Sequence, residues 1–325
     1  MERVEPYDLV IIGGGPIGMA CGLAAGRNKL NYLILEKGAL VNSLFNYPLY
    51  MTFFSTAERL EIGDVPFTCI APKPGRQEAL EYYRNIQKHF SLNMHLFEQV
   101  EEVKKQQELF NIKSSKGLYQ AKNVVIATGF YDIPLYMGVK GEELAKVSHY
   151  YKEAHEYAFR KVLIVGANNS SVDAALECWR KGAEVTMVIR KGEINERVKY
   201  WVKPDIENRI AEGSIKAYFY SNLEEIRDNE VDIQTPDGKI TVQNDSVLAL
   251  TGYRPDLEFL EQSGVALNGA NFTPQYDAQT METNVEGLYL AGVVCGGLET
   301  HKWFIENSRV HADMIMQHIV EKSNY

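Results

Sequence analysis

The stretch Tyr7-Asp8-Leu9-Val10-Ile11-Ile12-Gly13-Gly14-Gly15-Pro16-Ile17-Gly18 decides the fold of this chain. Its apolar run is typical of a parallel strand covered on both faces, and a G-x-G-x-x-G pattern follows it directly. In this pattern Gly13 permits a tight turn, Gly15 lets the backbone approach a pyrophosphate, and Gly18 lets the next helix pack on the strand. The helix N-terminus adds unpaired N–H groups that suit phosphate. The stretch therefore predicts a dinucleotide-binding unit.

Three further features extend this first unit. A second apolar strand over residues 32–35 leads into Glu36, where an acid can hydrogen-bond a ribose hydroxyl. Another apolar strand ends in Ala-Thr-Gly at Thr128 and Gly129, where the backbone can close over a nucleotide. Residues 37–66 show little periodicity but many aromatic side chains, and we expect this segment to wrap a planar cofactor.

A second, degenerate unit begins with the apolar strand 161–165 and its glycine, Gly166. Asn168 and Ser171 stand where the second and third glycines of the triplet would be. Asparagine tolerates left-handed backbone better than most residues, and serine is small enough for a helix to pack on a strand. We therefore expect a second dinucleotide site here.

The strand at residues 184–189 predicts which nicotinamide cofactor this second unit takes. The strand is followed by Arg190 and Lys191. In sites for NAD, an acidic residue at this position accepts a hydrogen bond from the free ribose hydroxyl. Paired cations instead favour the 2′-phosphate of NADP. The sequence thus favours NADPH, although a basic pair at a strand end is also common as a solvated surface feature.

Composition and charge narrow the class of protein. The 325 residues are enough for two domains, and 45% hydrophobic with 24% charged residues is typical of globular chains. A net charge of −9 argues against nucleic acid and against an anionic membrane surface as partners. There is no run of 18 apolar residues and no apolar signal region at the N-terminus, so we expect a cytoplasmic protein. The four cysteines are scattered, without a C-x-x-C pair, and we predict no metal site.

The C-terminal part is expected to complete the first unit. A strand over residues 246–250 leads the chain back to it, and residues 287–292 form another buried strand that ends at Gly292. Residues 304–320 are amphipathic and predict one helix, whose N-terminus would favour the negative charge of a reduced flavin. His301 and Trp303 are candidate flavin or substrate contacts, or else capping and packing residues.

Two nested units with a C-terminal return predict an α/β fold with two Rossmann-like domains, and this arrangement resembles the small, thioredoxin-reductase-like flavoprotein disulfide reductases. The predicted domains are residues 1–133 with 255–325 for FAD and residues 134–254 for NADPH. The resemblance sharpens to the bacillithiol-disulfide reductase (YpdA-type) family on motifs spread over the chain. They are Phe45-Asn46-Tyr47-Pro48, Thr52-Phe53-Phe54-Ser55, Ile62-Gly63-Asp64-Val65-Pro66-Phe67, His149-Tyr150-Tyr151-Lys152-Glu153-Ala154-His155, Asn169-Ser170, Asp173-Ala174-Ala175-Leu176-Glu177 and Phe304-Ile305-Glu306-Asn307.

The resemblance implies a homodimeric enzyme with FAD that uses NADPH to reduce the disulfide of bacillithiol, a low-molecular-weight thiol. By position, it implies FAD contacts from Gly13, Gly15, Pro16, Ile17, Gly18, Glu36, Lys37, Asn46, Thr128, Gly129 and Gly292. It implies NADPH contacts from Gly166, Asn168, Asn169, Ser170, Ser171, Arg190 and Lys191.

One residue departs from the family pattern. Members carry a cysteine in Gly-Gly-Gly-Pro-Cys-Gly, taken as the thiol that attacks the disulfide, and here Ile17 stands in its place. Isoleucine cannot be a nucleophile. Cys21 lies one helical turn further on and is the substitute candidate, with Cys295 after it.

Three functions therefore stay open. The first is reduction of a small-molecule disulfide, as in the family. The second is electron transfer from NADPH to a small redox-carrier protein, ferredoxin or flavodoxin, which needs no cysteine. The third is a FAD-binding redox sensor that is not an enzyme.

Overall fold

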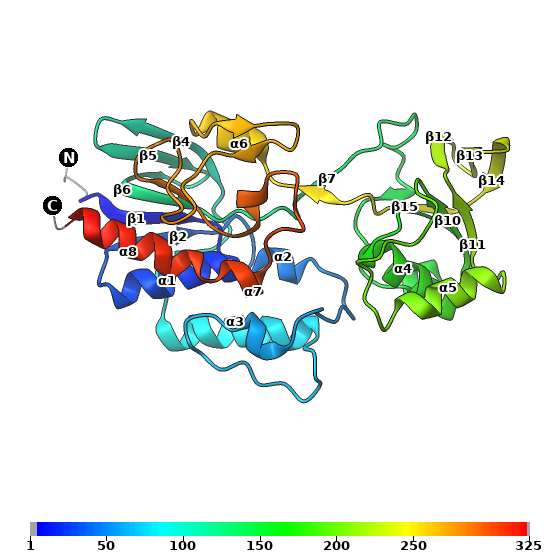
Figure 1. Ribbon diagram of the computed structural model, residues 1–325, viewed down its shortest axis with the longest axis horizontal. Coiled ribbons are helices and arrows are strands. Elements are labelled where there is room, and N and C mark those ends of the chain that lie inside the picture. The colour runs from blue at the N-terminus through cyan, green and yellow to red at the C-terminus, as the bar shows by residue number, and fades with distance from the viewer. Residues whose placement is uncertain (1–4, 324–325) are drawn as a thin grey trace. The chain divides into compact units, whose positions relative to one another are not determined.

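The computed structural model describes residues 5–323, and these divide into two compact units (Figure 1). Unit 1 contains residues up to 47, residues 51–133 and residues from 253 onward, and unit 2 contains residues 48–50 and 134–252. The segment Pro48–Tyr50 was predicted within the first domain, but it packs with unit 2, where the Leu49 N–H donates to the Lys152 carbonyl at 2.9 Å. Each unit is described by itself.

Unit 1 is built on a seven-stranded sheet with the order β3-β2-β1-β6-β5-β4, and β19 also pairs with β6. Strands β3, β2, β1, β6 and β19 are parallel, whereas β4, β5 and the first half of β6 are antiparallel. The bounds are β1 Tyr7–Ile12, β2 Tyr32–Leu35, β3 Met94–His95, β4 Val100–Gln106, β5 Leu109–Ser114, β6 Leu118–Ile126 and β19 Leu288–Leu290.

The central strands of this sheet form the core of unit 1. Val10, Ile11 and Ile126 are fully buried, as expected for parallel strands covered on both faces. Helix α1 (Pro16–Arg27) packs along α8 (His311–Ser323). The other helical segments of the unit are α2 Asn42–Phe45, α3 Arg76–Phe90, α6 Leu257–Gln262, α7 Ile305–Ser308 and the 3-10 turns Ala57–Leu60 and Gly292–Gly296. Its short strand pairs are β16 Tyr253–Arg254 with β7 Ile133–Pro134 and β17 Leu267–Asn268 with β18 Thr273–Pro274.

The expected single helix over residues 304–320 is two helices, α7 and α8. Arg309 lies between them, and its guanidinium donates to the carbonyls of Glu58 and Glu61 at 3.0 and 2.8 Å. These bonds tie α7 to the loop around the 3-10 turn Ala57–Leu60, while α8 packs on α1. Each helix therefore follows a different neighbour, and the amphipathic pattern could not show the break.

Unit 2 repeats the strand–helix–strand pattern in a five-stranded parallel sheet with the order β11-β10-β9-β15-β8. The bounds are β8 Val147–Ser148, β9 Lys161–Val165, β10 Glu184–Ile189, β11 Lys216–Phe219, β15 Ser246–Ala249, α4 Asn169–Arg180, α5 Lys203–Ala211 and the 3-10 turn His155–Tyr157. Helix α4 connects β9 to β10, as α1 connects β1 to β2.

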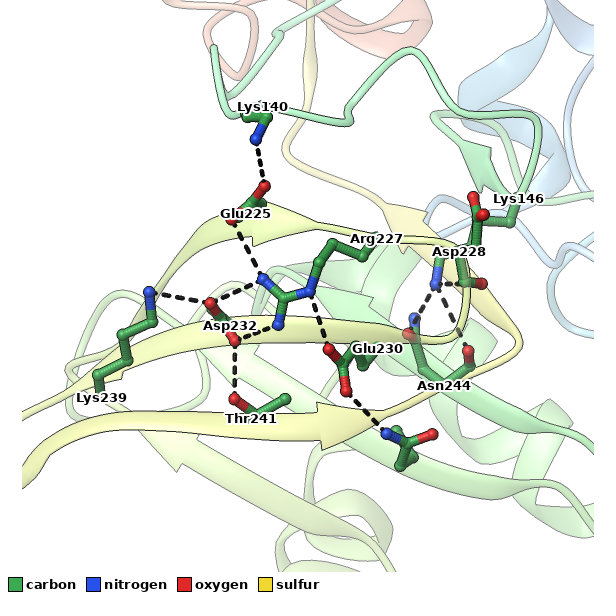
Figure 2. Close-up of polar contacts among 11 residues, drawn as sticks. Lys140, Lys146, Glu225, Arg227, Asp228, Glu230, Asp232, Lys239, Thr241 and Asn244 are labelled. Atoms are coloured by element: carbon green, nitrogen blue, oxygen red, sulfur yellow. Dashed lines mark hydrogen bonds and ion pairs between the residues drawn. The ribbon is translucent and has the colours of Figure 1, made fainter.

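A small antiparallel sheet of β12 (Asn222–Ile226), β13 (Glu230–Thr235) and β14 (Gly238–Gln243) completes unit 2. Figure 2 shows the polar network on it, in which the Arg227 guanidinium donates two bonds to the buried Asp232 carboxylate at 2.6 and 2.9 Å. Lys239 and Thr241 also bond to Asp232. Arg227 above all, with Lys239 and Thr241, lowers the pKa of Asp232, so this charge is fully compensated.

Candidate functional site

An open cleft lies at the carboxyl ends of β1, β6 and β19 in unit 1, where ligands bind in parallel α/β sheets. It encloses about 1410 Å³ of empty space, part of which is open to solvent. Of the predicted FAD contacts, the lining includes Gly13, Gly15, Pro16, Ile17, Glu36, Lys37, Thr128, Gly129 and Gly292. The structure therefore brings together residues that lie up to 279 positions apart in the chain.

The glycine turn after β1 shapes the floor of this cleft. Gly13 has a φ of +107°, which favours glycine, and a Cβ there would meet the Ala127 carbonyl oxygen at 2.5 Å. A Cβ on Gly18 would lie 1.8 Å from the Gly13 oxygen, so Gly18 is needed for packing and does not line the cleft. A Cβ on Gly15, by contrast, would meet no atom of the described chain within 4 Å. The space over Gly15 is therefore free for a ligand.

Glu36 follows β2 and lies at one wall of the cleft with a side chain that is only 5% exposed. Its carboxylate accepts hydrogen bonds from the N–H groups of Gly14 at 2.6 Å and Gly38 at 2.9 Å. Burial raises the pKa of this carboxyl, while the two N–H donors act in the opposite direction. Each oxygen keeps a second lone pair, so the held carboxylate can accept one more bond from a hydroxyl. This arrangement fits a ribose.

Two predicted FAD contacts have other roles or partners. Asn46 does not line the cleft, because its side-chain amide donates to the Asn42 carbonyl at 2.9 Å and its position caps α2. Lys37 does line it, but its ammonium pairs with Asp132 at 2.8 Å. His301 and Trp303, the other candidates, are outside the lining.

Sequence reasoning missed several lining residues. Tyr131 and Asp256 come from the two connections to unit 2, and Ser308 comes from α7. Tyr131 follows Thr128-Gly129 by two residues, so the strand-end motif was the available signal. Of the aromatic residues in 37–66, Tyr47 lines the cleft, and it packs edge-on against Tyr131 with ring centroids 4.7 Å apart. This aromatic pair suits a planar group.

The second glycine turn, after β9, is compact. Gly166 has a φ of +130°, and a Cβ there would meet the Leu250 carbonyl oxygen at 2.6 Å. Ser171 is fully buried and donates to the Asn168 carbonyl at 2.9 Å, so it stabilises the start of α4 in place of the third glycine. Ser170 is exposed beside it.

Charged and amide side chains surround this turn. Asn169 bonds to backbone groups of Arg197 and Lys199, which fixes the loop after β10 against α4. Arg190 and Lys191 are exposed at the end of β10, in the position predicted for the 2′-phosphate. Their charges are available to an anionic ligand.

The thiols are not placed for chemistry in the cleft. Ile17, 8% exposed, lines it at the position where the family resemblance led us to expect a cysteine. Cys21 is fully buried, and burial, with a smaller effect of Asp313, raises the pKa of its thiol to about 12. Cys295 is also fully buried, and burial raises the pKa of its thiol well above the ordinary value. None of the four cysteines lines the cleft of the described chain, so the candidate Cys21 cannot reach a disulfide there.

Residues 5–323 hold neither a metal cluster nor a membrane-spanning helix. No group of three or more His, Cys, Asp or Glu side chains in this range is arranged to hold a metal ion. No helix in this range is long and apolar enough to cross a membrane.

Comparison with known proteins defines the class. A family model described as pyridine nucleotide-disulphide oxidoreductase matches residues 10–292. The chain therefore belongs to this family of flavoprotein oxidoreductases and is an enzyme, and the family confirms FAD and NADPH as its cofactors. Similarity to thioredoxin reductase from T. acidophilum, with a TM-score of 0.77, 20% identity and 99% and 100% of the two chains covered, confirms the thioredoxin-reductase-like fold.

Closer relatives narrow the assignment. The chain is 43% identical to bacilliredoxin reductase Bdr of Bacillus subtilis (strain 168), over 97% of this chain and 98% of that protein. It is 42% identical to bacillithiol disulfide reductase Bdr (YpdA) from Bacillus cereus, with a TM-score of 0.96 and coverage of 98% and 100%. Within the larger family it belongs to the bacillithiol disulfide reductase (YpdA-type) family, as its motifs indicated. It is a flavin-dependent reductase of the thioredoxin-reductase type.

Proposed function

We propose that this enzyme uses NADPH to reduce the disulfide of bacillithiol, with FAD held in the cleft of unit 1 and NADPH at the second glycine turn in unit 2. The observation that carries the proposal is the cleft itself, which joins the open space over Gly15 to the oriented Glu36 carboxylate. The overall reaction consumes one NADPH and one proton and yields NADP⁺ and two thiols. The two electrons of the hydride break the disulfide bond.

The chain's own residues would bind, orient and exclude water. The glycine turn would take the pyrophosphate of FAD, Glu36 would accept a bond from a ribose hydroxyl, and Tyr47 would cover the ring system. FAD, when bound, supplies the two-electron chemistry between nicotinamide and acceptor. Ile17 would supply a dry apolar surface beside Gly292, where a Cβ would lie 3.3 Å from the Ile17 side chain.

We infer from Ile17 that no protein thiol takes part in the electron path. The buried, protonated Cys21 and Cys295 support this inference. The proposed reaction is thus the one expected for the family, but the proposed electron path lacks the cysteine that the family pattern includes.

The presence of Ile17 in place of a cysteine also favours a second candidate function, electron transfer from NADPH to ferredoxin or flavodoxin, because that reaction needs no cysteine. The third reading, a redox sensor that is not an enzyme, is wrong for a member of this oxidoreductase family. We also propose a cytoplasmic homodimer, whose molar mass in solution would be twice 36.8 kDa.

The test is a steady-state assay of NADPH consumption with bacillithiol disulfide, ferredoxin or flavodoxin as acceptor. We expect bacillithiol disulfide to give the highest kcat/KM, and the Cys21→Ser variant to match the parent enzyme within about twofold, since its thiol is buried. Turnover with ferredoxin or flavodoxin alone would replace the first proposal by the second. A loss of disulfide turnover in Cys21→Ser, with FAD content unchanged, would overturn the thiol-free path.

A further inference from the structure

His311, the first residue of α8, is a buried polar side chain that the proposed function does not use. It is 1% exposed, and its Nδ1 accepts a hydrogen bond from the Gly292 N–H at 3.2 Å. An accepting Nδ1 requires the neutral ring, with its proton on Nε2. The geometry thus fixes both the charge and the tautomer of this histidine.

The neighbours of His311 hold its ring in place. The Trp303 indole packs edge-to-face on it, with ring centroids 4.6 Å apart and an interplanar angle of 78°. The Cys295 sulfur lies 4.0 Å from Nδ1. Burial lowers the pKa of His311 to about 4, which agrees with a neutral acceptor at pH 7. These contacts orient the neutral imidazole toward the Gly292 N–H whose hydrogen bond it accepts.

Gly292 is the residue through which His311 reaches the cleft. It follows β19, lines the cleft, and has a φ of +85° that glycine adopts without strain. Ile17 lies against one side of it, since a Cβ on Gly292 would meet the Ile17 Cγ1 at 3.3 Å. Its N–H is hydrogen-bonded to His311. Ile17 and His311 therefore both hold the wall of the cleft at Gly292.

We propose that His311 is a positioning residue for FAD: it holds the Gly292 turn, through the hydrogen bond to its N–H, in the shape that the bound cofactor requires. This rests on the proposed function only in placing FAD in the cleft of unit 1. Without the acceptor, Gly292 would leave a buried N–H unpaired and the turn would be free to rearrange. FAD would then have to order the turn when it binds.

Three variants test this. His311→Leu fills the site with an apolar side chain and removes the acceptor, whereas His311→Asn places an amide oxygen near the position of Nδ1. Ile315→Ala, a fully buried position on the same helix, removes packing and leaves the Gly292 bond intact. The measurements are the dissociation constant for FAD, by quenching of flavin fluorescence, and the unfolding temperature of the apoprotein.

We expect His311→Leu to raise the FAD dissociation constant about tenfold and His311→Asn to stay within about threefold of the parent protein. Ile315→Ala should lower the unfolding temperature of the apoprotein with no change in FAD affinity. Unchanged FAD affinity in His311→Leu, or equal losses in the leucine and asparagine variants, would overturn the proposal. If the leucine variant does not fold, His311→Ser, which is too short to reach Gly292, replaces it in the same comparison.

The readout separates this proposal from the proposed function. FAD affinity does not depend on which acceptor the enzyme reduces, so failure with bacillithiol disulfide would leave the result for His311 intact. Conversely, unchanged FAD affinity in His311→Leu would say nothing against disulfide reduction.

Discussion

Gly15 and Gly18 show how two glycines of one motif act differently at the scale of single residues. A side chain at Gly18 would collide with the Gly13 carbonyl, whereas a side chain at Gly15 would project into open space. Gly15 also has extended backbone, with φ −71° and ψ 179°, which any residue adopts. One position is therefore required by the fold and the other by the ligand.

We predict that Gly15→Ala lowers FAD affinity at least tenfold while changing the stability of the apoprotein by less than about 1 kcal/mol. The added Cβ would occupy the space that the pyrophosphate needs. Gly18→Ala is the matched contrast, since it should lower the unfolding temperature even without FAD. Normal FAD binding by Gly15→Ala, measured by fluorescence titration, would rule out this turn as the phosphate site.

The buried His311 leads to a second prediction about a single residue, namely how the free energy of unfolding depends on pH. Its folded pKa of about 4 lies below the ordinary value of 6.5, so the unfolded chain takes up this proton first as the pH falls. The stabilisation is fully present above pH 6.5 and is lost between pH 6.5 and 4, by about 3 kcal/mol. Around it, the thiols of Cys295 and Cys21 stay protonated throughout this range. The charged groups that act on these two thiols are Lys302, on Cys295, and Asp313, on Cys21.

Denaturant unfolding at pH 7, 6, 5 and 4 measures this effect. His311→Asn should be less dependent on pH than the parent protein by about 3 kcal/mol over the interval. An identical pH dependence in both proteins would mean that the buried histidine is already charged or is paired with another group.

Sequence could predict some of these residues and not others. Gly13, Gly15 and Glu36 lie in a local motif with fixed spacing, so their positions follow from the chain itself. His311 meets Gly292 across 19 positions and a turn, and no periodicity connects them. Asn46 was placed in the site by position alone, and its side chain is instead used to end α2.

At the scale of elements, β10 is the strand to which we assign the choice between NADPH and NADH. Its last residue is Ile189, so the exposed Arg190 and Lys191 lie at the carboxyl end of this strand. The loop that follows is held to α4 by Asn169. The loop that starts with the two cations is therefore anchored to α4 further along, at residues 197 and 199.

We predict that Arg190→Ala lowers kcat/KM for NADPH about tenfold and leaves kcat/KM for NADH nearly unchanged, since a charge-assisted bond to the 2′-phosphate contributes about 1.5–3 kcal/mol. Lys181→Ala, an exposed lysine just after the far end of α4, is the control and should alter neither value. Equal losses with both cofactors would show that Arg190 does not recognise the 2′-phosphate.

Element boundaries show a similar limit of sequence reasoning. Helix α3 has a regular amphipathic pattern, with Ala79, Tyr82, Tyr83 and Ile86 on its buried face, and the periodicity of residues 75–91 predicts one helix there. The break between α7 and α8 was not predicted, because it depends on Arg309 bonding to carbonyls some 250 residues earlier in the chain. An amphipathic pattern indicates that one face of a segment is buried. It does not indicate whether one neighbouring element or two cover that face.

At the scale of the whole molecule, the two units repeat one plan, a glycine turn between a parallel strand and a helix. This repeat could be predicted from the sequence because the strand, turn and helix of each copy are contiguous in the chain. The strand order could not, since β19 joins β6 from more than 160 residues away and thereby carries Gly292 to the cleft. The sequence was enough to show that residue 17 is not a cysteine. The burial of Cys21 and Cys295 in the core could be seen only in the structure.

We propose above all that this enzyme passes electrons from NADPH to bacillithiol disulfide without a protein thiol. The most direct measurement is anaerobic and covers a single turnover: the FAD enzyme is reduced with one equivalent of NADPH, and flavin absorbance is followed after bacillithiol disulfide is added. We predict rapid reoxidation with release of two thiols per flavin, at the same rate in the parent enzyme and in Cys21→Ser. A flavin that stays reduced with the disulfide, yet is oxidised by ferredoxin or flavodoxin, would contradict the account.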